Sequence, residues 1–288
     1  MNRFTDLNAE RPSLSHREFG LLRDLFLERA GLEFEESSSF AFERRLGERV
    51  VELGLKSFHE YYKYLRFGGN GEQELELALE KVTTAETYFY RQDYQLRAFQ
   101  VEVLPILRSQ NRSNRSLVLW SAGCSTGEEV YTLAILVKES GLFDNWSVRV
   151  IGSDLSRERV AAARRGVFRE ASFRTSGWLK ERYFTPSGEG WRVDSEIKAM
   201  CRFGQLNLTE PGATATVGRV DVVFCRNVLI YFGQMARARV IDNLYRRLKP
   251  GGYLFLGHSE SLLNVTTAFE LVHLTEDLVY RKPSSAYL

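Results

Sequence analysis

Residues 120–135, WSAGCSTGEEVYTLAI, place a turn rich in glycine and serine between an apolar run and a segment with helical periodicity. The run before the turn, SLVLW (116–120), predicts a buried strand, and EVYTLAILVKESG predicts the helix that follows. Two interpretations of Glu128 and Glu129, in the first turn of this helix, are open. They could cap the helix, because free N–H groups and the dipole favour negative charge there. Alternatively, they could hold a ligand that bears hydroxyls or positive charge.

Short apolar runs recur further along the chain and predict more buried strands: VRVIGSDL (148–155), VDVVFCRNV (220–228) and GGYLFLGHS (251–259). The segment MARARVIDNLYRRLKPGG predicts a helix between the last two. Strands that alternate with helices favour a mostly parallel, doubly wound α/β sheet. Residues 168–203, with FTPSGEGWRV in the middle, interrupt this alternation and are interpreted as an inserted β-subdomain. The stretch ELVHLTEDLVYRKP predicts a closing hairpin.

The first 80 residues instead predict a small helical bundle. Ser15 and Glu18 have the spacing of a capping box, and Gly31 marks the end of the first helix. Further helices are predicted over FAFERRLGERVVEL, over FHEYYKYLRF behind a Ser57 cap, and over residues 72–82. The residues expected to face inward include Phe19, Leu22, Phe26, Ala30, Phe42, Leu46, Val50 and Leu53. We predict a helical domain over 1–82, a linker over 83–95 that contributes to the ligand site, and an α/β domain over 96–288.

Composition limits the class of protein. The chain has 288 residues, 44% of them hydrophobic and 26% charged, which is ordinary for a soluble globular protein. Its polar N-terminus has no apolar signal core, and no run approaches the roughly 18 apolar residues of a membrane span. The three cysteines stand far apart, which argues against a zinc site or disulfides and for a reducing compartment. We therefore expect a cytoplasmic protein without direct membrane insertion, and a monomer by default.

Polar residues stand where four predicted strands end, and open α/β sheets bind ligands at the carboxyl ends of their strands. These residues are Gly123 with the two glutamates, Asp154, Asn207 with Leu208, and Arg226 with Asn227. An acid one strand beyond a Gly-rich turn commonly holds ribose hydroxyls. The turn lacks both GxGxxG and the lysine of a phosphate-binding loop, and its glutamates would repel a pyrophosphate. The pattern disfavours NAD and ATP and favours S-adenosylmethionine (SAM), an adenosine that carries an amino acid.

At this point the chain resembles the CheR family, the chemotaxis receptor glutamate O-methyltransferases. The motifs that carry the resemblance occur in the family's order over nearly the whole chain: TTAETYFYR (83–91), WSAGCSTGEEVYTLAI (120–135), GSDL (152–155), NL (207–208), FCRNVLIYF (224–232) and GGYLFLGHSES (251–261). The resemblance implies an N-terminal helical bundle followed by a doubly wound, Rossmann-like methyltransferase domain with a small β-subdomain insertion. It also implies an enzyme that forms glutamate methyl esters on the cytoplasmic helices of chemoreceptors, with S-adenosylhomocysteine (SAH) as its product.

The resemblance further implies the cofactor site, at Ala85, Thr87, Arg91, Gly123, Glu129, Asp154, Asn207, Leu208, Asn227 and Val228. The family usually has asparagine where this chain has Ala85, so we expect weakened SAM binding. The attacking carboxylate, of ordinary pKa about 4.3, is ionised at neutral pH and needs no general base. We expect Arg91 to orient charge and Tyr231 to hydrogen-bond the incoming carboxylate. A structural ion pair and simple core packing are the respective alternatives.

Partners follow from charge and from the resemblance. Residues 1–80 carry a net charge of −5 and the remainder +7, which is too mild to imply nucleic acid by itself, and an aromatic–basic stripe is missing. Arg45 and Arg49 align with arginines that the family uses to meet the receptor, although a solvated face paired with glutamates is the alternative. The short FTPSGEGWRV connection favours independence from a receptor's C-terminal pentapeptide. Rival functions are a non-catalytic SAM or SAH scaffold and a methyltransferase with another substrate.

Overall fold

The computed structural model describes residues 11–83, 86–210 and 212–284. The chain divides into two compact units. The first comprises Met1–Thr84 together with Tyr231–Gly233, and the second comprises Ala85–Ile230 together with Gln234–Leu288. Ala85, one of the expected cofactor residues, lies outside the described residues.

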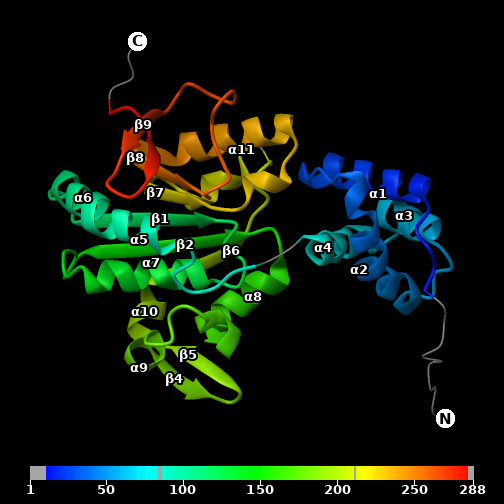
Figure 1. Cartoon of the computed structure of the whole chain (residues 1–288), viewed down its shortest axis with the longest axis horizontal. Helices are drawn as coiled ribbons and strands as arrows, with labels where there is room; N and C mark the ends of the chain where they lie inside the picture. Colours follow the sequence, from blue (N-terminus) through cyan, green and yellow to red (C-terminus); the bar gives the residue numbers. More distant parts are fainter. Residues whose placement is uncertain (1–10, 84–85, 211, 285–288) are drawn as a thin grey trace. The chain divides into compact units, whose positions relative to one another are not determined.

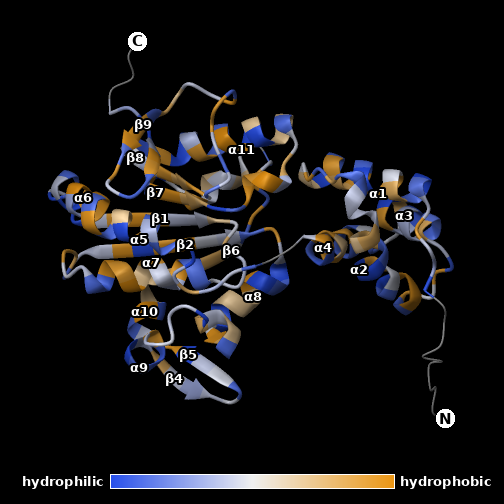
Figure 2. Ribbon diagram, in the orientation of Figure 1, coloured by the Kyte–Doolittle hydropathy of each residue, from blue (hydrophilic) through white to orange (hydrophobic). Residues whose placement is uncertain are grey.

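The N-terminal unit is helical, as the sequence predicts. Its elements are α1 (His16–Ala30), η1 (Glu36–Ser38), α2 (Ser39–Glu52), α3 (Phe58–Phe67) and α4 (Gly71–Val82). The capping box is confirmed, because Ser15 and Glu18 exchange side-chain-to-backbone hydrogen bonds. Gly31 ends α1 in the left-handed region at φ 71°, a conformation that glycine adopts without a steric cost. The helices carry hydrophilic and hydrophobic residues on different faces (Figure 2).

The apolar faces of these helices meet in an aromatic core. Phe19 and Phe26 of α1 pack against Phe42 of α2, with ring centroids 5.1 and 5.5 Å apart, and all three side chains are buried. Leu53, expected to face inward, is only half-buried, because α2 ends one residue before it. The remaining inward-facing predictions for α1 and α2 are confirmed.

The second unit is built on a mostly parallel sheet, as the sequence predicts. The strands are β1 (Ser116–Ala122), β2 (Ser147–Asp154), β6 (Cys201–Gln205), β7 (Val220–Cys225), β8 (Leu248–Leu256), β9 (Glu270–His273) and β10 (Leu278–Arg281). Among the described residues they lie in the order β6-β2-β1-β7-β8-β10-β9 (Figure 1). Strands β6, β2, β1, β7 and β8 pair in parallel, whereas β10 runs antiparallel to β8 and β9 and forms the expected closing hairpin.

Helical segments precede or connect these strands, and several of them pack against the sheet. They are α5 (Asp93–Ala98), the π-helical η2 (Phe99–Val103), α6 (Leu104–Gln110), α7 (Glu128–Glu139), α8 (Arg157–Arg165), η4 (Ala213–Val217), η5 (Leu229–Tyr231) and α11 (Gln234–Arg247). Helix α7 contacts β1, β2 and β6, and α11 contacts β8. In the core, the rings of Phe224 and Phe255 on neighbouring strands stack at 4.6 Å. The chain leaves β1 toward β2 on one side and continues from β7 toward β8 on the other, so a topological switch point separates β1 from β7.

The segment between β2 and β6 contains the expected insertion. It is made of β3 (Val167–Phe168), η3 (Glu170–Phe173), α9 (Leu179–Tyr183), β4 (Phe184–Ser187), β5 (Gly190–Val193) and α10 (Ser195–Met200). Strands β3, β5 and β4 form a small antiparallel sheet beside α7 and far from the β9–β10 hairpin (Figure 1).

This inserted subdomain holds the linker that precedes β1. The ring of Phe89 lies 4.9 to 5.1 Å from the rings of Phe168, Phe173 and Phe184 and is fully buried. The Phe89 N–H also donates to the Ser172 carbonyl at 2.9 Å. The linker therefore packs as part of the α/β unit. Thr87 and Arg91 each lie two residues from the buried Phe89.

Candidate functional site

The glycine turn after β1 begins the site. The N–H groups of Gly123 and Cys124 both donate to the Ser153 carbonyl at 2.8 Å, which ties the turn to the end of β2. Gly123 has φ +83°, and a Cβ there would lie 2.4 Å from a Val228 methyl group. Only glycine fits this close approach, so the fold brings Gly123 and Val228, both expected cofactor residues, into contact.

The two carboxylates assigned to the cofactor are fixed by hydrogen bonds around this turn. Asp154, at the end of β2, accepts from the Ser125 N–H at 2.8 Å and from the Ser156 N–H at 3.0 Å. Glu129, in the first turn of α7, accepts from the Ser121 hydroxyl at 2.7 Å. Both acids therefore stand at the carboxyl ends of adjacent strands in fixed orientations, which is the arrangement that the sequence predicts.

Glu128 has a different role from its neighbour. Its side chain is buried and accepts from the hydroxyls of Thr126 at 2.7 Å, Ser172 at 2.9 Å and Thr87. Burial raises the pKa of the Glu128 carboxyl, and these hydrogen bonds oppose the shift. Glu128 thus connects α7 to the inserted subdomain and to the linker, and Thr87, an expected cofactor residue, is one of its partners.

A buried arginine joins the linker to the sheet. Arg226 follows β7, its side chain is 2% exposed, and its guanidinium reaches the Glu129 carboxylate at 3.2 Å. It also donates to the Gln92 side chain at 3.0 Å and to the Arg91 carbonyl. Burial lowers the pKa of the Arg226 guanidinium, and the charge of Glu129 opposes that shift. Arg226 therefore fixes Glu129 and the backbone at Arg91 together.

The Arg91 side chain itself contacts Glu86. It donates to the Glu86 carbonyl, lies 3.7 Å from the Glu86 carboxylate, and sits 5.9 Å from the centre of the Tyr88 ring. These contacts lie within the linker, and Glu86 is the partner that a structural ion pair of Arg91 requires. A catalytic role for Arg91 stays a prediction.

The segments after β6 and β7 contribute the amide residues. Asn207 folds into a turn, accepting from the N–H and hydroxyl of Thr209 at 3.0 and 2.7 Å. The buried Leu208 offers its carbonyl to the Asn243 side chain at 2.9 Å. Asn227 adopts the left-handed region at φ 58°, an uncommon conformation for any residue except glycine.

Two buried polar atoms near the turn support a ligand site. Ser125 Oγ and Asn227 Oδ1 have no hydrogen-bond partner among the residues that the structure describes. Unpaired buried polar atoms are costly and are usually satisfied by a partner. A hydroxyl and an amide oxygen, beside the carboxylates of Asp154 and Glu129, suit a ligand with ribose hydroxyls, an amino group and positive charge. The residues present therefore fit SAM.

Cys124 lies in the same turn but is not suited to act as a nucleophile. Its side chain is buried, and burial raises the pKa of the Cys124 thiol well above its ordinary value. The thiolate is the reactive form of cysteine, and burial disfavours it here.

The N-terminal unit holds the other expected residues. Tyr231 ends η5 and groups with this unit, where its carbonyl accepts from the Glu33 N–H at 2.9 Å. Arg45 donates to the carbonyls of Lys81 and Val82 at the end of α4. Arg49 forms an ion pair with the buried Glu74 and a second with Glu52. Both arginines are half-buried and contact α4, and the Arg49–Glu52 pair matches the alternative of a face paired with glutamates. Their role in receptor binding stays a prediction.

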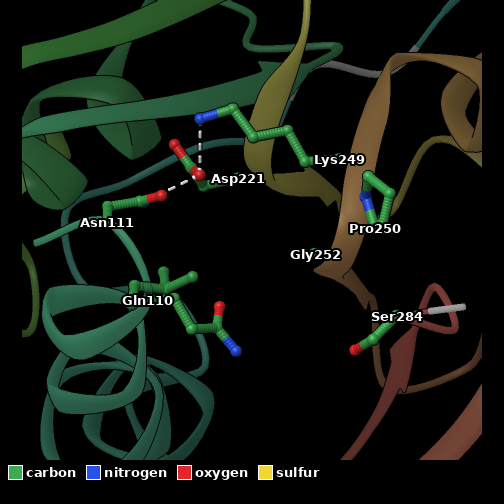
Figure 3. A pocket seen from close by; sticks show the side chains of 8 residues that line it. Gln110, Asn111, Asp221, Lys249, Pro250, Gly252 and Ser284 are labelled. Carbon is green, nitrogen blue, oxygen red and sulfur yellow. Dashed lines mark hydrogen bonds and ion pairs between the residues drawn. The ribbon is translucent and has the colours of Figure 1, made fainter. Parts of the chain in front are cut away.

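A cavity of about 280 Å³ lies at the opposite edge of the sheet, where β7 and β8 begin. Figure 3 shows Asp221 between Asn111 and Lys249, and its carboxylate accepts from these side chains at 2.9 and 2.7 Å. The Val118 N–H donates to the same carboxylate at 2.8 Å. Asp221, Asn111 and Lys249 are hydrogen-bonded to one another. The cavity lies where β7 and β8 begin, whereas the cofactor residues lie where the strands end.

Sequence reasoning missed two residues of the site. Arg226 was noted at the end of a strand without a role, and Glu260 lies inside the quoted GHSES motif. Glu260 accepts hydrogen bonds from the backbone of Asn227 and Val228. The available signal for Arg226 was an arginine that directly follows a mostly apolar strand. The Glu260 contact joins residues 32 to 33 positions apart and left no local signal.

The doubly wound sheet, its glycine turn and the paired carboxylates at the strand ends define a SAM-dependent methyltransferase. Comparison with known families agrees: residues 85–278 match the CheR methyltransferase SAM binding domain, and residues 17–83 match the CheR methyltransferase all-alpha domain. The chain belongs to the CheR methyltransferase family. Its cofactor is SAM.

Two curated relatives are similar over nearly their whole length. "Chemotaxis protein methyltransferase 2" of Vibrio cholerae is 32% identical and is covered over 94% of both chains. "Chemotaxis protein methyltransferase 1" of Pseudomonas aeruginosa is 32% identical over 93% of this chain and 99% of the relative. Within residues 11–83, 86–210 and 212–284, no helix has the length and apolar character needed to cross a membrane.

Proposed function

We propose that this protein transfers the methyl group of SAM to glutamate side chains on the cytoplasmic helices of chemoreceptors, forming methyl esters in the cytoplasm. The observation that carries the proposal is the match to both CheR domains, together with relatives named chemotaxis protein methyltransferase that cover 93 to 94% of this chain. The polar groups around the glycine turn, which suit a cationic adenosine ligand, support it. The modest net charge of +2 gives no support to nucleic acid as the substrate.

The proposed cofactor contacts surround the glycine turn. Asp154 would accept from the ribose hydroxyls, in keeping with its place one strand beyond the turn. Glu129 would hold positive charge, and the contact with Arg226 fixes the position of its carboxylate. The further proposed contacts are Thr87, Arg91, Gly123, Asn207, Leu208, Asn227 and Val228, with Ala85 as the position where a side-chain hydrogen bond is missing.

The chemistry requires alignment more than proton transfer. SAM supplies a methyl group on a positively charged sulfur, and the acceptor carboxylate is already ionised at neutral pH. The protein must then desolvate two opposite charges and hold them at attack distance. We assign Arg91 to orienting charge and Tyr231 to hydrogen-bonding the incoming carboxylate. Replacement of Arg91 by alanine should therefore lower kcat, and full turnover in that variant would remove its assigned role.

Receptor recognition is proposed for Arg45 and Arg49, and the test must respect their contacts. Arg49 pairs with the buried Glu74, so charge reversal there would destabilise the helices as well as any interface. Arg45 donates to the carbonyls of Lys81 and Val82, so Arg45→Glu is compared with Arg44→Glu, one residue earlier and exposed, at a temperature where both variants are folded. Weaker receptor binding in Arg45→Glu than in Arg44→Glu supports the assignment. Equal effects of the two variants would contradict it.

The test of the function is methylation of receptor-containing membranes by the full chain with methyl-labelled SAM. The proposed function predicts label in the receptor that is released as methanol by mild base, and little label with Asp154→Asn. SAH binding by calorimetry is the control for the cofactor site. Wild-type protein that binds SAH but leaves the receptor unlabelled would favour a non-catalytic scaffold, and base-stable label would indicate another substrate class.

A further inference from the structure

The segment that follows β7 is fastened by a carboxylate from the segment that follows β8. Among the described residues, four backbone N–H groups donate to Glu260. Those of Asn227 and Gly257 reach Oε2 at 2.7 Å each. Those of Val228 and Ile230 reach Oε1 at 2.8 and 3.3 Å. Glu260 therefore fills a backbone nest that would otherwise be an anion site.

The local geometry is built around this contact. A Cβ on Gly257 would lie 2.7 Å from Glu260 Oε2 and 2.8 Å from the Asn227 nitrogen, so a larger residue could not close the nest. Asn227 is held at φ 58°, a conformation that costs free energy and persists only where surrounding contacts offset that cost. The N–H groups that converge on Glu260 come from both sides of this strained residue, so the carboxylate stabilises the conformation of the whole segment.

We propose that Glu260 is a positioning residue of the methyl-transfer site, which holds residues 227–230 in the shape that presents Asn227 and Val228 to the cofactor. This inference rests on the proposed function only for the assignment of those two residues as cofactor contacts. Glu260 acts through the backbone and touches neither SAM nor the acceptor. Its charge is matched by the four N–H donors, so removal of the carboxylate leaves an empty nest with unpaired donors.

An empty nest makes a sharp test possible, because a small external carboxylate can fill it. In Glu260→Ala, SAH affinity should fall about tenfold or more, in keeping with the loss of hydrogen bonds to a charged group. Formate at high concentration should restore much of that affinity, whereas chloride at equal ionic strength should not. Glu260→Gln keeps the size of the side chain and should lose less affinity.

Glu270→Ala is the matched control. Its carboxylate lies in the same unit but is held by the Arg281 side chain at 2.7 and 2.9 Å, so it occupies no backbone nest. This variant should bind SAH as the wild type does and should not respond to formate. Unchanged SAH affinity in Glu260→Ala, or a loss that formate fails to reverse, would overturn the proposal.

A second readout separates this inference from the proposed function. Hydrogen exchange of the amides in residues 226–231 should accelerate in Glu260→Ala and slow again with formate, whether or not a receptor is methylated. Exchange equal to that of the wild type would overturn the positioning role. Failure of the proposed function would appear differently, as wild-type protein that binds SAH and leaves receptors unmethylated.

Discussion

Replacement of the buried Arg226 by leucine should destabilise the α/β unit strongly. The guanidinium pairs with Glu129 at 3.2 Å and donates to Gln92 and to the Arg91 carbonyl, with its side chain 2% exposed. Breaking a buried ion pair by removing one partner costs about 3–5 kcal/mol. For a unit of this size, 1 kcal/mol shifts Tm by about 2–4 °C, so Tm should fall by on the order of 10 °C.

The control for this prediction stands at the other end of the same strand. Arg219 directly precedes β7, is exposed, and makes one hydrogen bond to the Arg246 carbonyl at 2.7 Å. Arg219→Leu should change the free energy of unfolding by no more than about 0.5 kcal/mol. Both variants are compared by thermal melting, followed by SAH titration at a temperature where each is folded.

A second substitution tests whether the ion pair is the cause. Adding Glu129→Gln to Arg226→Leu removes the half-buried carboxylate that has lost its ion-pair partner, so the double variant should recover part of the lost stability. Arg226→Lys keeps the charge but not the forked geometry, and it should lie between the wild type and the leucine variant. Equal melting temperatures for Arg226→Leu and Arg219→Leu would refute the reasoning.

Three further predictions concern the site. Gly123→Ala should weaken SAH binding severely, because its Cβ would lie 2.4 Å from Val228, whereas Gly20→Ala, with no atom within 4 Å, should be neutral in the same calorimetric titration. Burial raises the pKa of the Glu128 carboxyl, so the folded protein binds this proton more tightly than the unfolded chain does. The resulting stabilisation is present below the ordinary glutamate pKa of 4.5 and is lost as the pH rises through the higher pKa of the folded state. In Glu128→Gln, the melting temperature measured across pH should lack this part of the decline. Ala85→Asn should tighten SAM binding by about 0.5–1.5 kcal/mol if the missing side-chain hydrogen bond is restored, and unchanged affinity by calorimetry would contradict this expectation.

The sequence alone determined the elements and their order. Helix boundaries in the N-terminal unit depend on local signals, such as the Ser15–Glu18 capping box and the left-handed Gly31, which act within a few residues. The buried parallel strands are visible because continuous apolar runs distinguish them from the amphipathic helices. The strand-end rule then placed Gly123, Asp154 and Asn227 at one edge of the sheet, since parallel strands share a common direction.

Only the tertiary structure decided which side chains meet. The sequence left Arg49 open between a receptor contact and a face paired with glutamates, and the structure pairs it with the buried Glu74 of α4. Arg226 and Glu260 act on backbone groups that are distant in sequence, at residue 91 and at residues 227–230. A capping or apolar pattern lies within one element and can be recognised in the sequence. These contacts instead depend on how strands and loops pack against one another, and a local pattern does not contain that information.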